Sequence, residues 1–429
     1  MFIKNFLFFL LFCHLQFLGM AQPNFVTAKG HQFFISNKPY YFIGANYWYG
    51  GIIANTTKGK IRIQKELDFL KSKGITNLRI VAGIEGEGKI NGVDRIAPPF
   101  QPTQGVFDSR QLDGLDFLLV EMKKRNIKAV LYLSNNWDWS GGFLQYLTWN
   151  GLLEDSIMRR KLSWDENRDY VSKFYTCQTC TDAYDVQLKE IVNRVNSVSG
   201  ITYKNDPSIM AWQLANEPRP MRTAAIEAYV AWTHRVAKLI KSIDHNHLVT
   251  SGVEGEAGTE TLKVFKQVHQ SKDIDYATIH IWPKNWGWFK DTAISKDLKN
   301  IEENTLAYIN KHATVARQLN KPLVLEEFGL PRNLHQYNLD ASVSLRNQYF
   351  TTIFKKWDKS RSSLDVLAGC NFWAFAGLGR PSGKAVLWTK GDDYIGDPPP
   401  EEQGLNSIFD TDFSTWKIIQ TFTKKLKLK

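Results

Sequence analysis

The feature that most constrains the fold is a regular alternation between short, β-prone apolar runs and longer amphipathic stretches. Apolar runs separated by helical patterns predict parallel strands, each followed by a helix that covers the sheet. Eight strand–helix repeats over about 400 residues predict an α/β fold, a closed (β/α)8 barrel of the TIM-barrel type. The eight predicted strands are Tyr41–Trp48, Asn77–Ala82, Lys128–Asn135, Ile209–Glu217, His247–Gly255, Tyr276–Pro283, Pro322–Gly329 and Ala368–Gly377.

The remaining segments fit around this barrel. Asn24–Tyr40 carries turn signals and predicts a short β-hairpin on the barrel floor. Two long polar stretches, Trp149–Asp182 and Lys384–Asn406, follow strands, so they belong to long βα loops on the face where such barrels carry their functional sites. Apolar residues at helical spacing predict helices over Gly59–Lys73, Ser109–Arg125, Met221–Ile243, Leu298–Leu319 and Ser342–Trp357.

The N-terminus has the pattern of an export signal. Lys4 is followed by the apolar run Phe6–Phe12, and the small residue Ala21 precedes Gln22. This pattern predicts a secretory signal peptide over residues 1–21, with residues 22–429 forming a single domain that is extracellular or periplasmic. A membrane anchor is disfavoured because the apolar stretch is short for a span of roughly 20 residues.

The cysteines and the net charge limit the kinds of binding site that the chain can have. In an exported chain, Cys177 and Cys180 predict a local disulfide rather than half a zinc site, because no second ligand pair follows at the required spacing. Cys370 lies in an apolar run and is expected to be buried. The net charge of +11 comes from scattered Lys and Arg residues, which favours a solvated surface over nucleic-acid binding. No metal or organic cofactor is implied, and we expect a monomer.

Acidic residues lie at the carboxyl ends of two otherwise apolar predicted strands. Glu217 ends the fourth predicted strand, and Glu326 and Glu327 lie near the end of the seventh. A carboxylate at such a position is costly unless it is paired or functional. Glycoside hydrolysis needs one acid to protonate the leaving oxygen and one carboxylate opposite it. Alternation along a strand lets only one of Glu326 and Glu327 face the cleft, and the spacing alone leaves that choice open.

Five motifs carry a family resemblance over nearly all of the predicted mature chain. They are Asn216-Glu217-Pro218, Glu326-Glu327-Phe328-Gly329, Asn77-Leu78-Arg79, His280-Ile281-Trp282-Pro283 and Trp373. With them the chain resembles glycoside hydrolase family 5, and within it the mannanase branch. The resemblance implies that Glu217 is the acid/base and Glu327 the nucleophile, and it leaves Glu326 in a contact behind the strand.

The resemblance also implies partners for these two acids. Arg79 corresponds to the positive partner that keeps the nucleophile ionised, Asn216 to a donor for the sugar 2-hydroxyl, and His280 to the active-site histidine. Glu217 is expected to have a raised pKa so that it starts protonated. Trp282 departs from the family pattern, since many relatives have a tyrosine there that hydrogen-bonds the nucleophile.

Tryptophans near strand ends suit the stacking of sugar rings. By resemblance, Trp373 lies at the subsite before the cleavage point; for any other single tryptophan, packing in the core is an equally good interpretation. The candidates are Trp48, Trp137, Trp139, Trp282, Trp286, Trp288, Trp373 and Trp388.

Together these observations predict a retaining endo-β-1,4-mannanase, a mannan endo-1,4-β-mannosidase. Its partner would be a polysaccharide substrate: mannan, glucomannan or galactomannan. Asn135-Asn136-Trp137 and the acidic, proline-rich stretch Asp392–Gln403 resemble the mannanase branch. The alternatives are a β-1,4-glucanase, an exo-acting β-mannosidase, and a non-catalytic polysaccharide-binding barrel.

Overall fold

The computed structural model describes residues 24–290, 292–383 and 386–427; the predicted signal peptide, residues 1–21, lies outside them. Eight parallel strands form one sheet in the order β10-β9-β8-β5-β4-β13-β12-β11. The edge strands also meet, since Asp275 N donates to Val249 O at 2.8 Å and His280 N to Glu254 O at 3.0 Å. The sheet therefore closes into the predicted (β/α)8 barrel. Its strands are β4 (Phe42–Asn46), β5 (Asn77–Val81), β8 (Lys128–Tyr132), β9 (Ile209–Gln213), β10 (Leu248–Thr250), β11 (Ala277–Ile281), β12 (Leu323–Phe328) and β13 (Leu367–Phe372).

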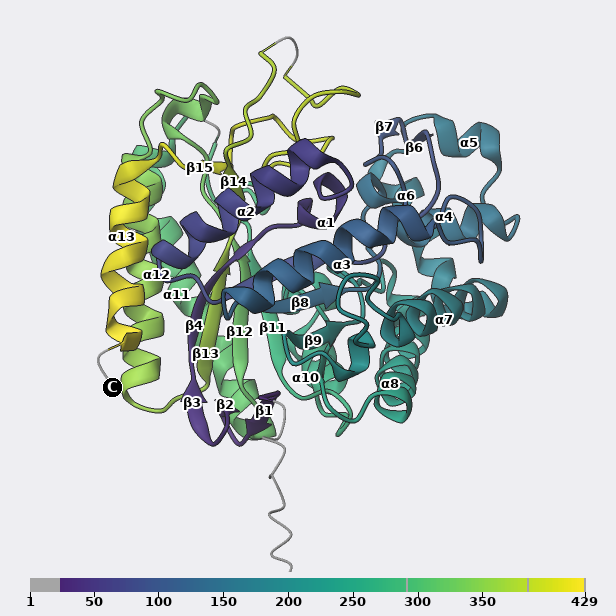
Figure 1. The fold of residues 1–429 in the computed structure, drawn as a ribbon, viewed down its shortest axis with the longest axis horizontal. Coiled ribbons are helices and arrows are strands. Elements are labelled where there is room, and N and C mark those ends of the chain that lie inside the picture. Colours follow the sequence, from purple (N-terminus) through teal and green to yellow (C-terminus); the bar gives the residue numbers. More distant parts are fainter. Residues whose placement is uncertain (1–23, 291, 384–385, 428–429) are drawn as a thin grey trace, which may run out of the picture.

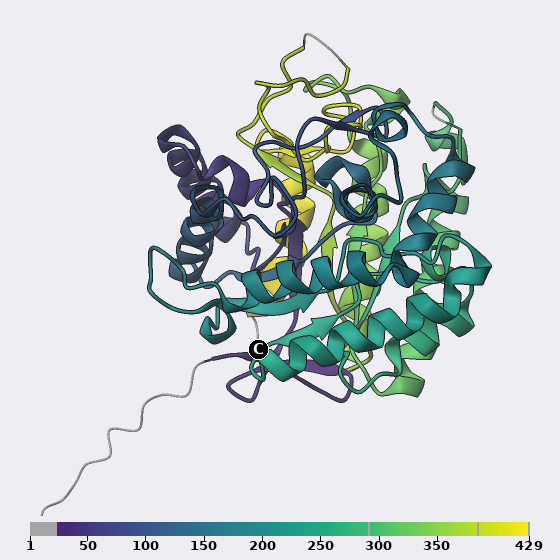
Figure 2. The ribbon, with the colours of Figure 1, turned by 90° about the vertical axis from the view of Figure 1, so that its right-hand side faces the viewer.

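Each barrel strand is followed by a helix that packs outside the sheet (Figures 1 and 2). Because helices cover the outer face and side chains fill the interior, the strands are buried on both faces, which explains their nearly unbroken apolar sequences. The helices are α2 (Thr57–Ser72), α3 (Ser109–Lys124), α7 (Gln178–Asn193), α8 (Ile226–Ile243), α10 (Leu262–His269), α11 (Ile294–Leu319), α12 (Ser344–Ser362) and α13 (Phe413–Thr423).

Several element boundaries differ from the prediction. The predicted strand Ile209–Glu217 is shorter than predicted and stops at Gln213, four residues before Glu217. The predicted strand Ala368–Gly377 divides into β13 and β14 (Phe375–Gly377), and β14 pairs with β15 (Ile408–Phe409). The predicted helix from Met221 begins at Ile226, since Met221 has a φ of 64° and a 3-10 turn, η4 (Thr223–Ala225), intervenes.

The predicted hairpin is present and has a third strand. β1 (Val26–Lys29), β2 (Gln32–Ile35) and β3 (Lys38–Tyr40) form an antiparallel sheet at the lower end of the barrel in Figure 1. Phe33 packs in one buried cluster with residues from the amino ends of the barrel strands, and its ring meets Tyr276 edge-on at 5.2 Å. The sheet therefore closes the floor of the barrel, as predicted.

The opposite end carries the insertions (Figure 1). The polar stretch after β8 folds mainly into helices rather than open loop, and the Cys177–Cys180 disulfide begins α7. Cys370 is buried and forms no disulfide among the described residues. None of the described helices combines the length and apolar character that crossing a bilayer requires. The smaller elements here are α1 (Gly50–Ile53), β6 (Lys89–Ile90), β7 (Val93–Asp94), η1 (Asp138–Ser140), α4 (Gly142–Trp149), α5 (Asp155–Arg159), α6 (Trp164–Ser172), η2 (Lys173–Thr176), α9 (Glu256–Thr259) and η5 (Asn333–His335).

Candidate active site

A cavity of about 440 Å³ lies over the carboxyl ends of the barrel strands. Both predicted acids, Glu217 and Glu327, line it, as does Asn216. The carboxyl ends of all parallel strands reach one rim of a barrel, so residues distant in sequence converge there. The other residues lining the cavity are Trp137, Asp138, Trp139, Trp164, Arg219, Glu254, Ala257, Trp282, Asn285, Trp286, Trp373, Pro400 and Glu401.

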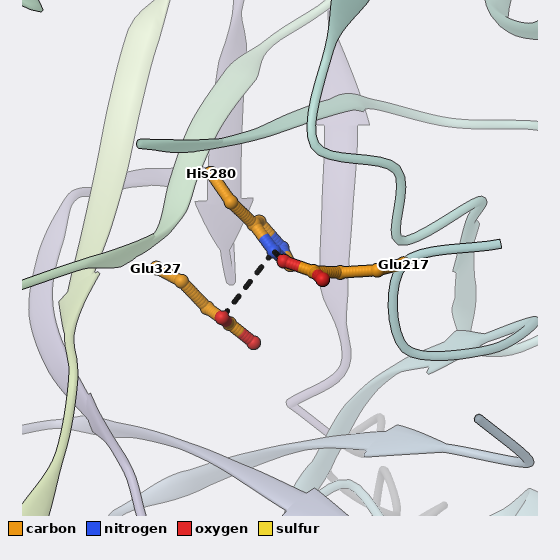
Figure 3. Close-up of side chains that lie close together, drawn as sticks. All are labelled: Glu217, His280 and Glu327. Carbon is orange, nitrogen blue, oxygen red and sulfur yellow. Dashed lines mark hydrogen bonds and ion pairs between the residues drawn. The ribbon is translucent and has the colours of Figure 1, made fainter. Parts of the chain in front are cut away.

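The two predicted acids face each other with His280 between them (Figure 3). A carboxylate oxygen of Glu217, one of Glu327 and a ring nitrogen of His280 all lie within 4.8 Å of one another. His280 Nδ1 is 2.6 Å from Glu217 Oε1 and 3.4 Å from Glu327 Oε2. Two buried carboxylates this close cannot both stay ionised without positive charge or a shared proton.

His280 supplies that charge. Burial lowers the pKa of His280, but the negative charge of Glu327 and the hydrogen bond to Glu217 raise it more, to about 10. Burial likewise raises the pKa of Glu217, yet the hydrogen bond and charge of His280 lower it more, so it lies below its ordinary value. The expectation of a raised Glu217 pKa is therefore wrong, because these pKa directions favour the proton on His280, whose Nδ1 lies 2.6 Å from Glu217 Oε1.

Besides His280, Glu327 contacts Arg79 and Trp282. Arg79 Nη1 lies 2.5 Å from Glu327 Oε1, and Trp282 Nε1 donates to Oε2 at 3.2 Å. Burial raises the pKa of Glu327 to about 7 against the lowering effects of His280 and Arg79. The indole N–H of Trp282 thus supplies a hydrogen bond to this carboxylate, as a tyrosine does in many relatives.

Arg79 links several side chains below the cavity through hydrogen bonds. Its Nη2 donates to Asn216 Oδ1 at 2.6 Å and its Nε to Gln213 Oε1 at 2.8 Å. Asn216 in turn donates to Asn135 Oδ1 at 3.1 Å. Glu326 points away from the cavity, where Gln213 donates to it and Arg79 Nε lies 3.7 Å away. Of the two adjacent glutamates, Glu327 therefore faces the cavity, which agrees with the choice made from the resemblance.

The backbone at Glu217 is held in an unusual conformation. Its φ is 51°, a left-handed value that costs a residue with a side chain about 1 to 3 kcal/mol. Hydrogen bonds on both sides hold it, from Glu217 N to Gly252 O at 3.0 Å and from Asn216 N to Ser134 O at 2.8 Å. Trp137 Nε1 also donates to Glu217 Oε2 at 2.5 Å. The side chain is thereby aimed into the cavity.

The predicted aromatic residues divide into two groups. Trp137, Trp139, Trp282, Trp286 and Trp373 line the cavity, whereas Trp48, Trp288 and Trp388 do not among the described residues. Trp48 is fully buried, its Nε1 donates to Gly396 O, and the rings of Trp139 and Tyr394 pack against it. The expectation that Trp48 binds sugar is therefore wrong, because no face of its ring is accessible.

Several residues that line the cavity were not identified from the sequence, among them Arg219, Glu254, Trp164 and Glu401. Arg219 and Glu254 form an ion pair at 2.5 Å, Trp164 lies on α6, and Glu401 follows β14. Arg219 directly follows Asn216-Glu217-Pro218 and Glu254 is the last residue but one of the fifth predicted strand, so these positions could have indicated both. Trp164 lies inside a stretch that shows no strand pattern, and no local signal indicates its place.

The segment around Glu401 is held firmly against the cavity. Asp397 accepts hydrogen bonds from the backbone N–H groups of Gly404, Asn406 and Ser407. Burial and the negative charges of Asp397 and Glu327 raise the pKa of Glu401 well above its ordinary value. A neutral carboxyl group fixed at the cavity wall can both donate and accept hydrogen bonds.

Glu217, His280 and Glu327 could in principle share a metal ion, since their ligand atoms lie within 4.8 Å. A cation there would meet protonated His280 and the Arg79 guanidinium, which already neutralise the two carboxylates. The donor set therefore fits a proton-sharing site better than a metal site.

Comparison with known proteins gives a consistent result. The family model for glycoside hydrolase family 5 beta-mannosidase-like proteins matches residues 23–429. The chain is 28% identical to mannan endo-1,4-beta-mannosidase 4 of Solanum lycopersicum, covering 85% of this chain and 86% of that protein.

Two solved structures are similar to this chain in fold as well as in sequence. The family 5 mannosidase from Rhizomucor miehei is 31% identical, with a TM-score of 0.85 over 95% of this chain and 98% of that one. The endo-1,4-beta-D-mannanase from Thermotoga petrophila is 25% identical, with a TM-score of 0.68 over 90% of this chain and 100% of that one. The match over the whole described chain and the carboxylate pair in its cavity establish that this chain belongs to glycoside hydrolase family 5.

Proposed function

We propose that the protein is a retaining endo-β-1,4-mannanase in which Glu327 is the nucleophile and Glu217 the acid/base. The observation that carries this proposal is the separation of the pair, with an oxygen of each carboxylate within 4.8 Å. Retaining enzymes hold their carboxyl groups about 5 to 5.5 Å apart, whereas inverting enzymes leave roughly 6.5 to 9.5 Å for a water molecule. Carboxylate oxygens within 4.8 Å of each other are closer to the retaining arrangement than to the inverting one, which supports direct attack on the sugar.

In the first step Glu327 attacks the anomeric carbon and the glycosidic bond breaks. Arg79 and Trp282 stabilise the ionised Glu327 before attack. Glu217 passes a proton to the leaving oxygen, and this proton reaches Glu217 from His280 Nδ1 across their 2.6 Å contact. The proton moves as the leaving oxygen develops negative charge.

In the second step the covalent glycosyl-enzyme is hydrolysed. Bonding to the sugar removes the charge of Glu327, which leaves Glu217 as the carboxylate near the anomeric carbon. Glu217 then takes a proton from water, and the hydroxide oxygen displaces Glu327. Two inversions at one carbon give net retention of configuration.

The choice of β-mannan rests on the family and on the cavity walls. The plant relatives are named mannan endo-1,4-beta-mannosidases. Five indoles predicted to bind sugar line the cavity, and flat aromatic faces suit the C–H faces of pyranose rings. By resemblance, Trp373 covers the sugar before the cleavage point, and Asn216 contacts its 2-hydroxyl.

A second candidate, an exo-acting β-mannosidase, is favoured by the wall that Pro400 and Glu401 form beside the cavity. A wall on one side of a cleft limits how many sugars fit there. The structure with a TM-score of 0.85 also carries the name mannosidase. Product length over time separates the two, since endo cleavage gives mixed oligosaccharides early and exo cleavage gives mannose alone.

The central test measures release of reducing ends from mannan, glucomannan and carboxymethylcellulose, with Glu327→Gln as the inactive control. We expect cleavage of the first two, and proton NMR of the first product should detect the β-anomer. Cleavage of carboxymethylcellulose alone would replace mannan by β-glucan, and an α-anomer would exclude retention. Binding to mannan without turnover would identify a non-catalytic barrel.

We further propose that residues 1–21 direct export and that residues 22–429 form the mature, monomeric catalytic domain. Expression with the native N-terminus in a secreting host should give extracellular or periplasmic protein that begins at Gln22. Mass spectrometry of the exported protein measures the cleavage site, and size-exclusion chromatography with light scattering measures the oligomeric state.

A further inference from the structure

The cavity continues into a second hollow on one side. This adjoining hollow has a volume of about 360 Å³ and shares Trp164, Arg219 and Ala257 with the main cavity. Its outer wall includes Arg168, Glu256 and Glu260, which offer both donors and acceptors for hydrogen bonds. Because the two hollows share these three lining residues, they are parts of one cleft.

The direction of this extension follows from the chemistry proposed above. Glu217 protonates the oxygen of the leaving group, so the leaving sugars lie on the Glu217 side of the cleavage point. Arg219 lies two residues after Glu217 and borders the second hollow. The second hollow therefore lies on the leaving-group side.

Trp164 lines both this hollow and the main cavity. It is the first residue of α6 and its surface is 51% exposed. Its ring stacks near that of Trp137, with centroids 6.2 Å apart and planes at 26°. Trp137 itself contacts Glu217 through its indole N–H. The two nearly parallel rings place Trp164 next to the indole that contacts the acid/base, and the Arg219 guanidinium lies over the Trp137 ring, 4.9 Å from its centroid.

An exposed tryptophan can also be an incidental surface residue. Here the helix that carries it is tied to the segment after Glu217. Arg168 of α6 donates to Met221 O at 2.8 Å, and Arg222 contacts Asp169 at 2.7 Å and Asp165 at 3.1 Å. Ser163 and Glu166 form a capping box that fixes the start of α6 beside Trp164. Trp164 is therefore held in place before substrate arrives, which reduces the entropy lost on binding.

We propose that Trp164 is the stacking platform for the second sugar on the leaving-group side, one ring beyond Trp137. This proposal rests on the proposed function and deepens it by defining the length of leaving group that the enzyme recognises. The ligand is a β-linked pyranose chain, whose C–H face lies on the indole while its hydroxyls reach Arg168, Glu256 and Glu260.

The test compares a long leaving group with a short one. Trp164→Ala should lower kcat/KM for mannohexaose about tenfold, because one sugar–aromatic stack of roughly 1.4 kcal/mol is lost. Hydrolysis of 4-nitrophenyl β-mannobioside should stay unchanged, since its aryl leaving group ends before Trp164. Trp164→Phe keeps a flat ring and should recover most of the activity on mannohexaose.

Phe413→Ala is a matched control, since Phe413 is 75% exposed and starts α13, away from the cleft. It should leave both substrates unaffected. Equal losses on both substrates, or an unchanged rate on mannohexaose, would overturn the role of Trp164 while the function stands. A wild-type protein that cleaves neither substrate would instead overturn the proposed function, and this proposal with it.

Discussion

Replacing Trp282 by phenylalanine tests how the protein sets the charge of Glu327. The variant keeps an aromatic ring in the cavity and removes the N–H that lies 3.2 Å from Glu327 Oε2. A hydrogen bond to a charged group contributes about 1.5 to 3 kcal/mol, and its length here favours the lower value. One pKa unit corresponds to about 1.4 kcal/mol, so the pKa of Glu327 should rise by about one unit.

The sign of the activity change follows from the role of Glu327. Burial sets its pKa to about 7 in the wild type, and attack requires the ionised form. Activity should therefore be lost as pH falls through about 7 in the wild type, and through about 8 in Trp282→Phe. At pH 6 kcat/KM should differ by roughly tenfold, and near pH 9 the two proteins should converge.

The assay is kcat/KM for 4-nitrophenyl β-mannobioside between pH 5 and pH 9. Trp286→Phe is the control, since Trp286 lines the same cavity and no contact of its indole N–H with either glutamate occurs among the described residues. An acidic limb that stays in place would refute the hydrogen bond as the cause. A loss of equal size at every pH would point to a changed fit of the sugar instead.

Three further outcomes are expected. Glu327→Gln should reduce hydrolysis to background with an unchanged circular dichroism spectrum, because only the nucleophile is lost; residual turnover above about one part in a thousand would count against this role. Glu217→Ala should lose mannan hydrolysis but still release dinitrophenol from an aryl β-mannoside, whose leaving group needs no proton; equal losses on both would exclude the acid role. Reducing the Cys177–Cys180 disulfide should lower the free energy of unfolding by at most about 2 kcal/mol, because the closed loop is very short; chemical denaturation with and without dithiothreitol measures this.

Much of the architecture follows from local pattern. The eight mainly apolar runs predicted the eight barrel strands because a strand covered on both faces is apolar over most of its length. The boundaries failed at strand ends, as at Asn216 and Glu217, because these side chains belong to the rim beyond the regular ladder, which ends at Gln213. The helices in Trp149–Asp182 were missed because their polar sequences are stabilised by capping and by ion pairs to other segments.

The features of the active site likewise divide into those that the local sequence predicted and those that depend on packing. The strand pattern alone predicted that Glu217 and Glu327 reach one rim, because the carboxyl ends of parallel strands share an edge. The packing of distant segments set the rest: the carboxylate oxygens lie within 4.8 Å of each other, His280 Nδ1 lies 2.6 Å from Glu217 Oε1, and Trp282 Nε1 reaches Glu327. It also decided that Trp48 is buried while Trp164 is exposed beside the cleft. The physical reason is that pKa values, side-chain directions and accessible faces depend on neighbours brought together from distant segments, which local sequence does not encode.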